Sequence, residues 1–220
     1  MNETLAREEI CRVGRSLFER GYVHATAGNI SVRLDDGFLI TPTDACLGFL
    51  DPAQLSKVSP AGQQVSGAPA SKTLVLHRRI YEAHAGNGAA PRSVIHTHST
   101  HCVALTLDDP QGELLPPITP YFVMKVGHVP VVPYHRPGAA EVGALVAALI
   151  ARYAAQGTPL RAVMLTRLGP NVWHDSPAQA MAVLEELEET AKLWHLSQRR
   201  TQPLSPEAIA ELRTSFNASW

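Results

Sequence analysis

Residues 95–101 read IHTHSTH, with histidine at positions 96, 98 and 101. The apolar residues around them predict a short buried strand over residues 92–97, and a helix follows it. Side chains two positions apart in a strand point to the same face, so His96 and His98 can converge on one divalent cation. His101, in the first turn of the helix, is placed to support that pair from outside. The alternative is a polar strand end whose histidines bond to backbone groups.

Helices and short strands alternate along the rest of the chain without a regular βαβ rhythm. This favours an α/β fold in which helices pack on a mixed or mainly antiparallel sheet. No repeat or long linker divides the sequence, so we expect residues 1–220 to form a single domain. Helices are expected over residues 3–20, 71–84, 99 onward, 139–156, 176 onward and 205 onward, and strands over 30–34, 38–41, 129–134 and 161–166.

The composition excludes several classes of protein. The chain has 220 residues, 45% of them hydrophobic, and a net charge of −1, so no basic excess points to nucleic acid or to an anionic membrane. The N-terminus has no apolar signal region, and the longest apolar stretch, residues 143–151, is too short for a membrane span. Three separated cysteines favour neither a disulfide framework nor a thiolate zinc site. We expect a cytoplasmic protein.

Three short segments have the residue types that bind anions. Gly28 and Asn29 tolerate unusual backbone angles and can present N–H groups to a ligand, although an ordinary turn has the same composition. Ser71 is expected to cap the helix over residues 71–84, where the helix dipole favours negative charge, and Lys72 adds a positive charge. The segment around Thr43 can join them. Simple capping by Ser71 is the alternative, and it does not exclude ligand binding.

Together these pieces resemble the class II aldolase/adducin family over nearly the whole chain. Several stretches are most similar to one branch, the decarboxylases of 3-oxo-tetronate 4-phosphates. The segments that carry the resemblance are residues 28–31, 41–43, 46–52, 55–58, 71–72, 96–98, 119–124, 136–138 and 184–193.

The resemblance implies a three-layer αβα fold with a central, mainly antiparallel sheet, assembled as a homotetramer with active sites at subunit contacts. It implies a divalent metal, usually zinc, held by His96, His98 and a third histidine. The phosphate of the substrate is expected on Gly28, Asn29, Thr43, Ser71 and Lys72. Tyr121 lies in a stretch that reaches a neighbouring subunit's site in related enzymes, so Lys72 and Tyr121 are the expected catalytic residues.

The implied reaction converts a small phosphorylated sugar acid, a 3-oxo-tetronate 4-phosphate, to dihydroxyacetone phosphate and carbon dioxide. Loss of carbon dioxide leaves an enediolate, whose charge a metal stabilises. Two alternatives remain open: another sugar-phosphate aldolase or epimerase of the family, and a binding protein without catalysis on the same fold.

The sequence departs from the family pattern at two positions. Family members have a carboxylate, usually Glu, after the serine segment, and this chain has Thr73. The third metal histidine of the family is replaced by Leu168, and leucine cannot bind zinc. Other histidines that can replace it are His128, His135 and His174, and the sequence does not choose among them.

Overall fold

The computed structural model describes residues 2–84, 90–108 and 111–220. These residues form two compact units. The first comprises residues 1–98 and 173–181, and the second comprises residues 99–172 and 182–220.

The first unit is built on five strands in the order β4-β3-β2-β1-β5, in which every neighbouring pair is antiparallel. The register between β1 and β5 places Asn29 opposite His96, so the predicted anion turn and the predicted metal pair meet at one end of these two strands. The five strands are β1 (Asn29–Leu34), β2 (Gly37–Ile40), β3 (Ser56–Val58), β4 (Gln64–Ser66) and β5 (Ser93–His96).

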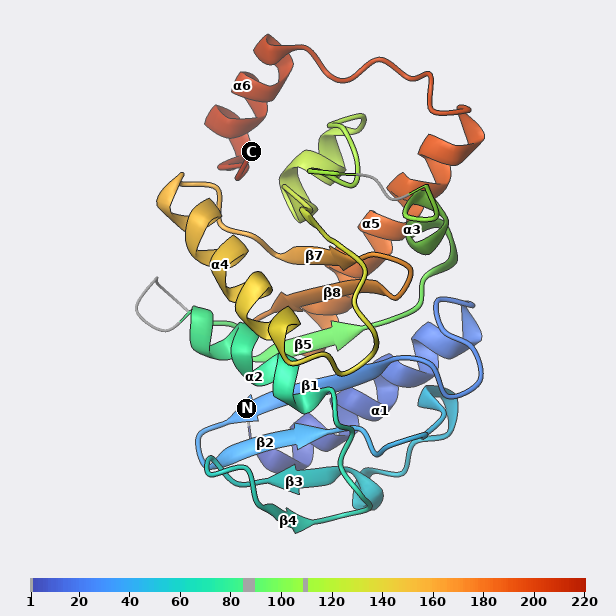
Figure 1. Cartoon of the computed structure of the whole chain (residues 1–220), viewed down its shortest axis with the longest axis vertical. Helices are drawn as coiled ribbons and strands as arrows, with labels where there is room; N and C mark the ends of the chain where they lie inside the picture. Colours follow the sequence, from blue (N-terminus) through green and yellow to red (C-terminus); the bar gives the residue numbers. More distant parts are fainter. Residues whose placement is uncertain (1, 85–89, 109–110) are drawn as a thin grey trace. The chain divides into compact units, whose positions relative to one another are not determined.

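Two helices cover opposite faces of these strands, α1 (Glu3–Glu19) behind them and α2 (Leu74–Ala83) in front (Figure 1). Helix α1 begins where the Asn2 side chain accepts a hydrogen bond from the Leu5 amide, and a buried stripe at helical spacing packs it on the sheet. Two 3₁₀ turns, η1 (Leu47–Phe49) and η2 (Pro52–Gln54), complete the unit.

The second unit contains three strands in the order β8-β7-β6. Strand β7 (Ala162–Leu165) is antiparallel to β8 (Gly169–His174) and parallel to β6 (Val131–Val132). The last two residues of β8 belong to the first unit. The helices are α3 (Thr100–Leu105), a short π-helix η3 (Phe122–Val126), α4 (Glu141–Ala155), α5 (Pro177–Leu196), which begins in the first unit, and α6 (Pro206–Phe216).

The observed elements correct four sequence expectations. Thr73, not Ser71, is the N-cap of α2, because the Ser71 hydroxyl bonds to the Thr73 hydroxyl at 2.8 Å. Strand β6 has only two residues of the expected six. Strands β3, β4 and β8 were not predicted. Glu188, expected on a solvated face of α5, is buried and accepts hydrogen bonds from the backbone of α3 at His101 and Cys102.

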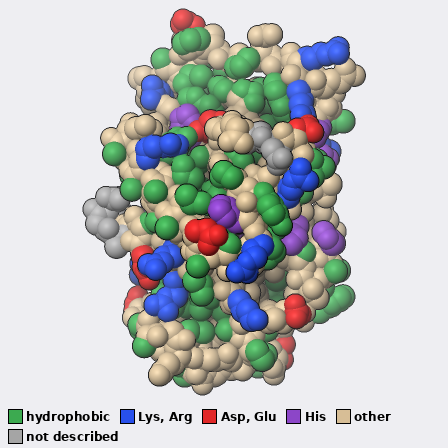
Figure 2. Space-filling view, viewed as in Figure 1, with side chains coloured by type: hydrophobic (Ala, Val, Ile, Leu, Met, Phe, Trp, Pro, Cys, Tyr) green, Lys and Arg blue, Asp and Glu red, His purple; other side chains and the backbone are tan. Residues whose placement is uncertain are grey.

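Surface charge agrees with the balanced composition. Basic and acidic side chains are interspersed over the face shown in Figure 2. Within the described ranges, no helix is long and apolar enough to cross a membrane.

Candidate active site

The structure brings the rings of His96 and His98 together at the end of β5. Their centroids lie 5.1 Å apart, with the ring planes inclined at 66°. His96 is buried, with 8% of its surface exposed, and His98 is partly buried. Burial, together with the nearby His24 imidazole, lowers the pKa of His98. A neutral imidazole is the form that binds a metal, so this environment favours the ligating state of His98.

A third imidazole, which the sequence analysis missed, lies beside this pair. His24 belongs to the loop between α1 and β1, and its ring centroid is 6.4 Å from that of His98. The only signal in the sequence is a histidine four residues before Gly28, at the entrance of the predicted anion turn. As placed, no three His, Cys, Asp or Glu side chains among the described residues can hold a metal ion.

The three predicted anion-binding segments are joined to one another by hydrogen bonds. The Ile30 amide donates to the Thr41 hydroxyl at 3.3 Å, and the Thr41 amide donates to the Ile30 carbonyl at 3.1 Å. The Ser71 amide donates to the Thr41 carbonyl at 3.3 Å. Thr43 is fixed next to them, because its hydroxyl donates to the Ala70 carbonyl at 3.0 Å. The structure therefore gathers segments far apart in sequence into one cluster, as the anion-binding hypothesis requires.

Two residues of this cluster have features that suit a ligand. Gly28 has a φ of +87°, and a Cβ there would lie 2.9 Å from the His96 carbonyl oxygen, so only glycine allows this approach. The Oδ1 atom of Asn29 is buried, and within the described part of the chain it has no hydrogen-bond partner. A buried amide oxygen without a partner is costly, so a donor on a ligand or water can satisfy it.

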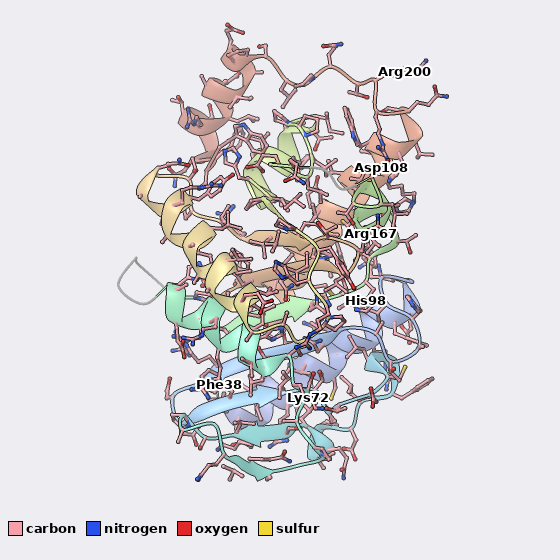
Figure 3. The ribbon with its side chains drawn as sticks, viewed as in Figure 1. Phe38, Lys72, His98, Asp108, Arg167 and Arg200 are labelled. Atoms are coloured by element: carbon pink, nitrogen blue, oxygen red, sulfur yellow. The ribbon has the colours of Figure 1, made fainter. Side chains whose placement is uncertain are left out.

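Lys72 is exposed at the start of α2, and it belongs to the same compact unit as His98; both residues are labelled in Figure 3. The side chain stands next to the Ser71 and Thr73 hydroxyls in sequence. It is therefore free to adjust to an anionic ligand.

A buried network holds α2 against β1 beneath these groups. His77 Nδ1 and the Ser31 hydroxyl are 2.8 Å apart, and the Tyr81 hydroxyl lies 2.7 Å from the same oxygen. Burial, with a smaller contribution from His96, lowers the pKa of His77 to about 3, and burial raises the pKa of Tyr81. The expectation that His77 is a bonded core residue is confirmed. The network fixes the start of α2 relative to the anion turn.

The remaining predicted residues lie in the second unit. Tyr121 immediately precedes η3 and is 61% exposed. Leu168 lies in the tight turn between β7 and β8, where its amide donates to the Leu165 carbonyl at 3.1 Å. The preceding residue, Arg167, has a φ of +63° and donates its amide to the Thr106 hydroxyl at 2.8 Å. An apolar side chain therefore occupies a well-defined turn at the position where the family places a metal histidine.

Of the other histidines proposed as replacements, each has a partner of its own. His128 lies 3.3 Å from Glu113 and stacks on Trp220, and His135 lies 3.6 Å from Glu141. His174 Nδ1 accepts a hydrogen bond from the Asp175 amide at 2.8 Å.

Comparison with known proteins agrees with the resemblance stated from the sequence. The chain is 53% identical to a 3-oxo-tetronate 4-phosphate decarboxylase of Cupriavidus necator, over 99% of both chains. It is 41% identical to the protein of the same name in Escherichia coli K12, over 96% of this chain and 97% of that protein.

Solved structures agree as well. The structure of YgbL from Klebsiella pneumoniae, assigned to the aldolases, epimerases or decarboxylases, matches 97% of this chain and all of its own, with 40% identity and a TM-score of 0.86. An L-fuculose 1-phosphate aldolase shares the fold, with a TM-score of 0.78 at 22% identity over 96% of each chain. The predicted α/β fold with mainly antiparallel strands is therefore confirmed. Residues 8–195 match the family described as Class II Aldolase and Adducin N-terminal domain, and the chain belongs to the class II aldolase and adducin family.

Proposed function

We propose that this chain is a carboxy-lyase that converts a 3-oxo-tetronate 4-phosphate to dihydroxyacetone phosphate and carbon dioxide. The observation that carries the proposal is the 53% identity, over 99% of both chains, to a protein with that activity in its name. The hydrogen-bonded cluster of anion-binding segments supports it, because the substrate has a phosphate at one end and a carboxylate at the other.

Substrate binding falls to the first unit. The backbone amides of the turn at Gly28 and Asn29, the hydroxyls of Thr43 and Ser71, and the Lys72 ammonium are the groups proposed to hold the phosphate. Holding the phosphate fixes the distant carboxylate relative to the reacting carbon, so binding energy remote from the reaction lowers the barrier.

The reaction breaks the bond between the carboxylate carbon and C2. Its electron pair moves into C2 and the C3 carbonyl, carbon dioxide leaves, and a proton added at C2 gives dihydroxyacetone phosphate. No base is needed to start the reaction, because the carboxylate is already ionised. A proton donor is needed afterwards, and Lys72, Tyr121 and water are the proposed sources.

Thr73 fits this chemistry better than aldol cleavage. Aldol cleavage requires a base that removes a hydroxyl proton, and the family carboxylate at this position supplies it. In this chain, the Thr73 hydroxyl bonds to Ser71 and cannot act as a carboxylate. Loss of the base therefore costs a decarboxylase less than an aldolase.

The family depends in general on a divalent metal, and we propose zinc for this chain because imidazole suits zinc. His96 and His98 are the proposed ligands. The family ligand set does not fit here, because Leu168 and Thr73 replace two of its members. No step above is therefore assigned to the metal.

We propose that the protein is a cytoplasmic homotetramer in which Tyr121 serves a neighbouring subunit's site. The exposure of Tyr121 supports this, since a tyrosine with 61% of its surface exposed is available to a partner.

The same departures favour a second candidate, a binding protein that has lost catalysis. The substitutions at positions 73 and 168 are the observation behind it. It predicts phosphate-ester binding without turnover.

The test is to incubate the purified protein with 3-oxo-tetronate 4-phosphate and measure carbon dioxide and dihydroxyacetone phosphate, with and without a chelator. We expect equimolar release of both products, lost after chelation and restored by zinc. Production of an aldehyde instead of carbon dioxide would assign an aldolase. No release by folded protein supplied with zinc would reject the proposal and favour the binding protein.

A further inference from the structure

We propose that His24 is the third protein ligand of the divalent cation, together with His96 and His98, and replaces the histidine that the family has at position 168. The inference rests on the proposed function only in that a cation binds at the His96 and His98 pair. Neither the sequence resemblance nor the relatives assign a role to His24.

The separation of the rings supports the assignment. A ring centroid lies about 3.2 Å from a zinc ion bound at one of its nitrogens, so two imidazoles at a tetrahedral angle have centroids about 5 Å apart. His96 and His98 already meet this condition, at 5.1 Å. His24 and His98, at 6.4 Å, are little more than 1 Å too far apart. A small rotation of the His24 side chain therefore completes a set of three nitrogen donors.

The loop that carries His24 is fixed where it must be and free where it must move. Its base is anchored by Tyr22 and Val23, which are 7% and 3% exposed, whereas His24 itself is exposed. The backbone then turns sharply, since Ala25 has a φ of +47° and the Ala27 amide donates to the His24 carbonyl at 2.9 Å. A non-glycine residue in the left-handed region stores strain, which is typical of functional loops.

The turn also brings this loop against the end of β5. Gly28 passes so close to the His96 carbonyl oxygen that a Cβ would lie 2.9 Å from it. The loop and the His96 and His98 pair all belong to the first compact unit, so their separations are set within one folded body. A histidine at position 24 is thus held next to the pair, and only its ring has to move.

His77 is the other histidine of this unit that is electrostatically coupled to His96, and its freedom is much smaller. The ring is fully buried, and its Nδ1 is held by the Ser31 hydroxyl. Moving it into a metal site requires repacking of α2 on β1. His24 requires no repacking, because it is exposed.

A site with three imidazoles has a chemical consequence. Three neutral nitrogen ligands leave the full double positive charge on the cation, whereas the family carboxylate neutralises part of it. Three protein ligands and an open position are typical of catalytic zinc sites. The site therefore suits an anionic substrate that brings its own oxygen donors.

Metal affinity of the apo-protein, measured without substrate, tests the proposal. Zinc is titrated in competition with a chromophoric chelator, and cobalt is titrated while its visible absorption reports the coordination geometry. We expect His24→Ala to weaken zinc binding about tenfold or more and to change the cobalt spectrum. His174→Ala is the matched control, because His174 has its own bond to the Asp175 amide, and it should bind zinc within about twofold of wild type.

A rescue variant sharpens the test. Adding Leu168→His to His24→Ala restores the family ligand, and we expect it to recover most of the lost affinity. Circular dichroism checks that each variant is folded, which we expect because residue 24 is exposed.

The outcomes separate this inference from the proposed function. Unchanged zinc affinity in folded His24→Ala overturns the ligand assignment, even if carbon dioxide is released. His24-dependent zinc binding without turnover supports the assignment and rejects the proposed reaction. Wild-type protein that binds neither zinc nor cobalt overturns the inference as well.

Discussion

At the scale of single residues, two glycines test how tightly the anion turn is built. Gly28 and Gly21 both have positive φ, +87° and +75°, so alanine is strained at either position. A Cβ on Gly28 would also meet the His96 carbonyl oxygen at 2.9 Å, whereas a Cβ on Gly21 meets no atom within 4 Å among the described residues. The pair therefore separates steric clash from backbone strain.

We expect Gly28→Ala to lower the free energy of unfolding by about 1–3 kcal/mol more than Gly21→Ala. Urea denaturation of both variants measures this difference. Gly28→Ala should also weaken zinc binding, because the loop that carries His24 must shift away from β5. Equal losses of stability in the two variants would show that the turn can move without cost.

Glu113 provides a second prediction at this scale. It accepts hydrogen bonds from the Val129 amide at 2.8 Å and from the Tyr153 hydroxyl, and it lies 3.3 Å from His128. Burial alone would raise its pKa, but hydrogen bonds from His128 and Tyr153 outweigh burial and lower it. The folded state therefore favours the ionised carboxyl, and the stabilisation is present above about pH 4.5 and lost as the pH falls through the lowered folded pKa.

We expect Glu113→Gln to cost about 1 kcal/mol of unfolding free energy at pH 7 and less at pH 4 and below. Chemical denaturation at both pH values gives the two differences. Glu211→Gln, at an exposed position of α6, is the control and should change stability at neither pH. A penalty for Glu113→Gln that is constant with pH would contradict the assigned role of the charge.

At the scale of elements, helices were easier to predict than strands, for physical reasons. Helices α1, α4 and α6 have local signals, namely apolar periodicity, capping residues and a terminal glycine or proline. Strand β8 was missed because its first residues, Gly-Pro-Asn, are typical of a turn, although Pro170 pairs with Met164 of β7. Strands β3 and β4 have three residues each, too few for alternation to show.

Helix α2 provides the prediction for this scale. Its start presents Lys72 at the anion cluster, and Arg79, also exposed, lies farther along the same helix. We expect Lys72→Ala to raise KM for the phosphorylated substrate about tenfold or more, since one charge-assisted bond is lost. Arg79→Ala should leave KM and kcat unchanged. Steady-state kinetics of both variants provides the measurement.

The kinetic parameters also show which role Lys72 has. A change in KM alone indicates phosphate binding, whereas a parallel loss of kcat with an altered pH profile indicates that Lys72 also donates the proton. An unchanged KM in Lys72→Ala would remove it from the site.

At the scale of the whole molecule, the sequence revealed those parts of the site that are local. His96 and His98 are two residues apart, and Ser71 and Lys72 are adjacent, so motif spacing finds them. His24 escaped, because its proximity to His98 depends on the antiparallel pairing of β1 with β5 and on the turn at Gly28. Tertiary contacts of this kind leave no pattern in a single sequence.

The remaining prediction concerns sites shared between subunits. If Tyr121 acts on a neighbouring subunit, Tyr121→Ala and Lys72→Ala damage different partners of the same site. Subunits of the two variants, dissociated and reassembled as a mixture, then form some sites with both residues intact. For equal amounts we expect about a quarter of wild-type activity to return, because each site draws at random on two subunits.

Lys72→Ala mixed with His98→Ala is the matched control for this experiment. Both residues belong to the first compact unit of one chain, so no intact site can form if that unit supplies them together. We expect this mixture to stay inactive, and sedimentation shows whether mixed tetramers have formed. Activity that returns in neither mixture, although mixed tetramers are present, would place Tyr121 in its own subunit's site or outside any site. The exposure of 61% at Tyr121 would then need another partner, and the homotetramer would have to be explained without shared catalysis.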